Sequence, residues 1–74
     1  MSQPHAPNRL LRLSAVESLV GLKRVRLYNL IAEGAFPKQV RLGDAPNSPV
    51  AWPEQEVQTW INQRIAMRNQ AVWV

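Results

Sequence analysis

The stretch from residue 21 to residue 38 constrains the fold of this 74-residue chain more than any other feature. Leu27, Leu30 and Ile31 recur at the spacing of a single helical face, which predicts a short helix over residues 23–33. A glycine stands on either side of this helix, and glycine readily takes the left-handed conformation that ends helices. The segment therefore predicts a short helix with sharp limits at both ends.

A second short helix is expected just before it. Ser14 and Glu17 have the spacing of a capping box, which predicts that this first helix starts at Ser14. Val16, Leu19 and Val20 form its apolar stripe, and the glycine that follows ends it after about two turns. Two short helices joined by a tight turn with glycine predict a helix-turn-helix.

The remaining segments predict a hairpin and a closing helix. Residues 39–42 alternate polar and apolar side chains as a half-buried strand does, and residues 50–52 supply its partner across a loop rich in turn-forming residues. Pro53 and the two acidic residues after it suit the first turn of a third helix. We expect a mostly α fold with a small β-hairpin, a winged helix-turn-helix. The predicted buried stripe of the third helix is Val57, Trp60, Ile61 and Ile65.

The chain divides into three parts. Residues 1–8 carry two prolines and no apolar periodicity, which predicts a disordered leader. Residues 9–66 form the predicted winged-helix domain, which opens with a short extended segment whose leucines dock on the core. Residues 67–74 form a tail that loses the helical pattern, and within it Trp73 can fold back, meet another subunit or remain loose.

Charge and composition favour a polyanionic partner and give no support to catalysis. The net charge is +4, with a sequence pI near 10.8. The chain has no cysteine, no nucleophile with partners at hand and no glycine-rich phosphate loop, so we expect no enzyme, metal, cofactor or small-molecule substrate. No apolar run reaches the roughly 20 residues of a membrane span. We therefore expect a cytoplasmic, nucleoid-associated protein with no membrane partner.

The outer face of the second helix holds the groups that can read DNA. Placing residues at 100° intervals leaves Val25, Tyr28 and Asn29 outward, with Arg26 on the flank. Arg26 can bind guanine, Asn29 can bind adenine, and Val25 can touch a thymine methyl group. Cations at the helix start suit phosphates. The candidate DNA-binding residues are Lys23, Arg24, Val25, Arg26, Tyr28, Asn29, Lys38 and Arg41.

Other interpretations of these side chains stay open. The cations of the second helix can form an ordinary solvated face. Tyr28 can contact DNA through its hydroxyl or pack at the edge of the core. Lys38 and Arg41 can hold phosphates or serve as charges that keep a strand edge from aggregating. Trp52 and Trp60 can act as stacking platforms, but their register with the buried stripe favours the core.

The order of several spaced pieces resembles the AlpA family of small phage and prophage regulators. This family is similar in fold to MerR-type winged helices and to phage excisionases, and the resemblance covers residues 9 to about 66. The pieces that carry it are residues 9–13, 16, 21–22, 27–34, 36–38, 40–43, 50–52, 56–57 and 60–61.

The resemblance implies a protein that binds double-stranded DNA and controls transcription. An excisionase-like factor that bends DNA beside an integrase is an alternative, as is a protein-interaction module that uses the third helix and Trp73. Partners implied are double-stranded DNA, an integrase or recombinase, and a second copy of the chain.

Two departures from the family pattern bear on specificity. Lys23, Val25 and Arg26 stand where the family usually has serine and small hydroxyl residues, which predicts a helix start weaker by about 1 kcal/mol and a different base preference. The hairpin is longer through residues 44–49, and Ala51 replaces an arginine. The longer hairpin and the missing arginine favour contact through the helix over contact through the wing.

Overall fold

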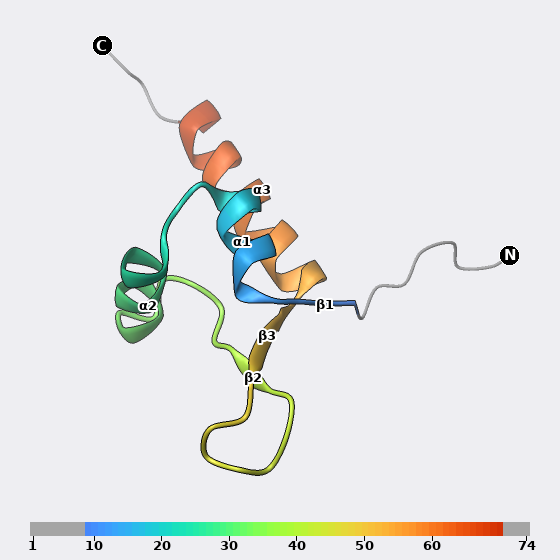
Figure 1. Cartoon of the computed structure of the whole chain (residues 1–74). Coiled ribbons are helices and arrows are strands. Elements are labelled where there is room, and N and C mark those ends of the chain that lie inside the picture. The colour runs from blue at the N-terminus through green and yellow to red at the C-terminus, as the bar shows by residue number, and fades with distance from the viewer. Residues whose placement is uncertain (1–8, 71–74) are drawn as a thin grey trace, which may run out of the picture.

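Three helices and a small three-stranded antiparallel sheet make up residues 9–70, which are the residues that this computed structural model describes (Figure 1). The fold is mostly helical, as expected. In chain order the elements are β1 (Leu10–Leu11), α1 (Leu13–Val20), α2 (Arg24–Ala32), β2 (Val40–Arg41), β3 (Val50–Pro53) and α3 (Glu54–Gln70). Residues 1–8 and 71–74, with the expected leader and Trp73, lie outside the described residues.

The sheet contains one strand more than the predicted hairpin. The hairpin itself is confirmed, because β2 pairs antiparallel with β3 through Val40 with Ala51 and Arg41 with Val50. On the other side of β3, β1 pairs through Leu11 with Trp52, which gives the strand order β1-β3-β2. A strand of two residues is too short to show an alternating pattern, so the sequence predicted only an extended segment here.

Helix α1 begins earlier than the capping box predicts. Its N-cap is Arg12, no side chain caps it, and the backbone carbonyl of Arg12 accepts a bond of 3.1 Å from the N–H of Val16. Ser14 therefore lies inside the helix, and the predicted capping box is wrong. The strand pairing of β1 sets this start, because it ends one residue before Arg12. The end of α1 at Gly21 is confirmed, with the Gly21 N–H bonded to the carbonyl of Glu17 at 2.8 Å.

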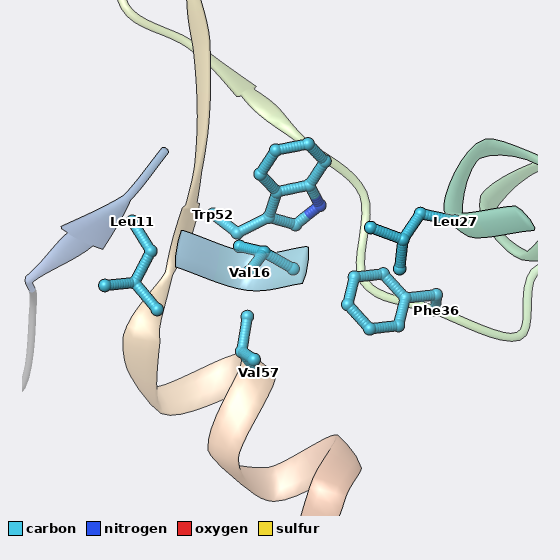
Figure 2. Close-up of a cluster of buried hydrophobic side chains, with 6 residues drawn as sticks. All are labelled: Leu11, Val16, Leu27, Phe36, Trp52 and Val57. Carbon is cyan, nitrogen blue, oxygen red and sulfur yellow. The ribbon is translucent and has the colours of Figure 1, made fainter. Parts of the chain in front are cut away.

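The core forms around β3, where side chains from every helix meet (Figure 2). Trp52 of β3 and Val16 of α1 are fully buried, with Val57 of α3 on one side of them and Leu27 of α2 on another. Leu11 of β1 closes the cluster at its far end. Burial of these apolar surfaces is the main stabilising term for so small a domain.

Two tryptophans hold the segment between α2 and β2. The indole N–H of Trp52 donates to the carbonyl of Pro37 at 3.0 Å, and that of Trp60 donates to the carbonyl of Ala35 at 2.7 Å. The ring of Trp60 also packs edge-on against Phe36, with centroids 4.9 Å apart. Trp52 is fully buried and Trp60 half-buried, so the core interpretation of both is confirmed.

Two predicted core residues lie at the surface instead. Leu19 is 49% exposed and Ile65 is 44% exposed. Helical periodicity assigned each residue to a face of its helix but could not show whether another element covers that face. Helix α1 is too short, and α3 extends too far beyond the other elements, for a partner to cover these two residues (Figure 1). Helix α3 runs to Gln70, so the expected loss of helical structure after Met67 is wrong for the described residues. Within residues 9–70 no helix is long and apolar enough to cross a membrane.

Candidate nucleic-acid interface

Helix α2 has one face on the core and one in solvent. Leu27 is fully buried, and Leu30 and Ile31 are partly buried against the core cluster. On the opposite face Val25 is 73% exposed, and Asn29 is exposed beside it. The predicted division of this helix into an inward stripe and an outward face is confirmed for these residues, whereas Tyr28, predicted to point outward, is half-buried.

The start of α2 carries cations and no compensating acid. Lys23 occupies the N-cap position in an extended conformation, makes no side-chain cap, and no acidic residue lies in the first turn. Lys23, Arg24 and Arg26 are all exposed. Among residues 9–70 none of these three forms an ion pair, in contrast to Arg9, which lies 3.3 Å from Glu54. The helix start thus presents uncompensated positive charge and free backbone N–H groups to solvent.

Two hollows flank α2, one on each side. The hairpin-side hollow has a volume of about 480 Å³ and lies between the starts of α1 and α2 and the returning arm of the hairpin loop. Its polar lining residues are Arg12, Ser14, Glu17, Arg24, Tyr28 and Ser48.

The α3-side hollow has a volume of about 490 Å³, and most of the residues that line it are apolar. Arg26 and Arg64 border it, together with Leu19, Leu30 and Ile65. The arginines of α2 therefore lie on opposite sides of the helix, because Arg24 borders the first hollow and Arg26 the second.

Tyr28 packs at the edge of the core. Its ring lies 6.2 Å from that of Trp52, at an interplanar angle of 67°, and the residue is half-buried. Edge-on aromatic packing of this kind stabilises a small core. The structure thus supports the packing interpretation of Tyr28, while the same side chain borders the hairpin-side hollow.

Lys38 and Arg41 are exposed but lie apart from the cations of α2. Lys38 is in the segment between α2 and β2, and Arg41 ends β2 opposite Val50. Neither residue borders the two hollows beside α2. The hairpin loop extends away from the helices (Figure 1).

The sequence did not single out Arg12 and Arg64. The fold brings Arg12 to the same hollow as Arg24, and Arg64 to the same hollow as Arg26. The guanidinium of Arg64 also lies 6.0 Å from the centroid of the Trp60 ring. No local pattern in the sequence pointed to Arg12, because its position at the N-cap of α1 follows from a helix start that the sequence did not predict.

Residues 9–65 match the family model described as prophage CP4-57 regulatory protein (AlpA). The chain belongs to the AlpA family. The matched residues extend from β1 through most of α3, so they contain every candidate DNA-binding residue of this chain. The predicted family resemblance is confirmed, and the family is one of prophage regulatory proteins.

A phage protein is similar to this AlpA-family chain. The uncharacterized protein ORF88 of Enterobacteria phage P4 is 46% identical over 61 residues, which cover 82% of this chain and 66% of the phage protein. The chain thus matches slightly under two thirds of the length of this relative. No solved structure matches the chain.

Proposed function

We propose that this AlpA-family protein is a regulator that binds specific sequences of double-stranded DNA, with α2 in the major groove. In this proposal α1 and α2 form a helix-turn-helix, and the β2–β3 hairpin is a wing. The observation that carries the proposal is the outer face of α2. There Arg24 and Arg26 lie on either side of Val25 and Asn29, and neither arginine forms an ion pair with any of the residues that the structure describes. A regulatory family and a net charge of +4 support it.

The candidate residues divide into base readers and phosphate binders. Val25 and Asn29 lie on the outermost line of α2 and would meet base edges, with Arg26 reaching guanine from the flank. Lys23 and Arg24, at the helix start, would bind phosphates on the near strand. Lys38 and Arg41 lie outside both hollows and would bind phosphates farther along the duplex.

The test begins with selection of a binding site from random duplexes, followed by titration at several salt concentrations. Log K should fall by about 0.9 per log salt for each phosphate neutralised. The Arg26→Ala variant should relax base preference at one position, with a loss of about 1 to 3 kcal/mol on the preferred site only. Lys23→Ala should weaken all duplexes alike, because a phosphate contact carries no base information.

Arg68→Gln is the matched control, since it removes one positive charge in the last turn of α3, outside the candidate DNA-binding residues. Equal losses on every duplex after Arg26→Ala would reject Arg26 as a base reader. Failure of the unmodified chain to prefer any sequence would reject specific DNA binding altogether. A bend in the bound duplex, measured by fluorescence transfer between its ends, would show that the protein deforms its site, as the excisionase-like alternative requires.

A further inference from the structure

Two arginines from separate parts of the chain border the hairpin-side hollow. Arg12 precedes α1 and Arg24 begins α2, yet both border one hollow of about 480 Å³. The hydroxyl-bearing residues Ser14, Tyr28 and Ser48 border it as well. Hydroxyl and guanidinium groups together are the usual donors to phosphate oxygens in proteins.

No ion pair among residues 9–70 neutralises the arginines of this hollow. Glu17 also borders it, but within residues 9–70 it forms no ion pair with Arg12 or Arg24. Two guanidinium groups therefore face one carboxylate. Leu13, Pro49 and Val50 supply apolar walls, and a cleft with walls of low dielectric constant strengthens the field of the charges that line it.

The hairpin loop gives this hollow a defined outer wall. The N–H of Leu42 donates to the carbonyl of Pro49 at 2.8 Å, and the N–H of Ser48 donates to the carbonyl of Ala45 at 3.1 Å. A Cβ atom on Gly43 would lie 2.8 Å from Oγ of Ser48, so the two sides of the loop touch at this point. Ser48 is thereby held at the edge of the hollow.

We propose that the hairpin-side hollow is a binding site for one phosphate of the DNA backbone, with Arg12 as a phosphate-binding residue. The inference rests on the proposed DNA binding and adds a contact outside α2. Arg24 and Tyr28 border the hollow from α2, so a strand beside the major groove that α2 enters would pass its mouth. Arg12 and Arg24 would hold the phosphate oxygens, and Glu17 would weaken the contact by repulsion.

The experiment compares Arg12→Gln with Arg68→Gln on the selected duplex. Arg12→Gln should weaken binding about tenfold and lower the salt slope by about 0.9, whereas Arg68→Gln should leave the slope nearly unchanged. Glu17→Gln should strengthen binding several-fold, and Glu56→Gln, an exposed acid on α3, should have a smaller effect. Arg12→Lys keeps the charge and should keep the salt slope while losing part of the affinity.

Replacement of single phosphates by methylphosphonate identifies the contact. At one position the uncharged linkage should weaken duplex binding by the unmodified protein about tenfold, and binding by the Arg12→Gln protein hardly at all. The proposal would be overturned if the affinity losses from Arg12→Gln and from the uncharged linkage added at every position. It would also be overturned if Arg12→Gln bound DNA as well as Arg68→Gln while Arg26→Ala still lost base preference. Absence of duplex binding by the unmodified chain would instead reject the proposed function. Thermal unfolding monitored by circular dichroism verifies that each variant is folded.

Discussion

Gly21 and Gly34 occupy conformations that other residues adopt at a cost. Their φ angles are 75° and 76°, within the left-handed region, and they follow α1 and α2 respectively. An added Cβ at either position would meet no atom within 4 Å. The requirement for glycine is therefore one of backbone conformation and not of space.

Substitution at Gly21 tests this backbone requirement. Gly21→Ala should lower the free energy of unfolding by about 1 to 2 kcal/mol, because alanine resists the left-handed region. Gly21→Asn should lower it less, since asparagine visits that region more readily. Urea unfolding measures both. Equal losses for the two variants would show that a contact, and not the backbone angle, requires glycine.

At the scale of the element, the start of α2 lacks the groups that usually stabilise a helix start. The N-cap residue Lys23 has the extended conformation of a cap but makes no side-chain hydrogen bond, and Arg24 adds a second cation where the helix dipole favours an acid. The sequence predicted a weak helix start because Lys23 stands where the family usually has serine, and this geometry agrees with that prediction. Local rules are commonly broken where function requires it.

Two substitutions at Lys23 separate stability from binding. Lys23→Ser should raise the free energy of unfolding by about 1 kcal/mol relative to Lys23→Ala, because serine can cap the helix. Both variants lose the same charge, so both should weaken duplex binding by a similar factor. Urea unfolding and duplex titration on the same samples provide the comparison. If the serine variant bound markedly better than the alanine variant, helix stability and not charge would limit binding.

At the scale of the whole molecule, the core is confined to the surroundings of β3. Val57 is fully buried there, while Ile65, on the same helix, is 44% exposed. The hydrophobic contribution of a side chain follows the apolar area that folding removes from water. Two aliphatic residues of one predicted stripe should thus contribute very differently.

Truncation of each residue tests this difference. Val57→Ala should cost about 2 to 3 kcal/mol, which combines lost burial with the cavity left behind. Ile65→Ala should cost less than about 1 kcal/mol, although it removes more atoms. Urea unfolding of both variants measures the contrast. A large loss at Ile65 in dilute protein would contradict its exposed position, and a loss that shrank on dilution would indicate that another chain covers it.

Local patterns in the sequence determined the faces and the end of α2. Periodicity and a glycine stop specify which side chains of α2 share a face and where the helix ends, because both depend on residues within a few positions of one another. For the same reason the outward position of Val25 and Asn29 was predictable. Their exposure in the structure agrees.

Only the tertiary structure decided which distant residues meet. The pairing of Leu11 with Trp52 moved the start of α1 and displaced the expected cap at Ser14. The tertiary structure also leaves Leu19 uncovered. Periodicity assigns a residue to a face of its helix but does not show whether another element packs there. The meeting of Arg12 with Arg24 depends on contacts between elements, which no local pattern records.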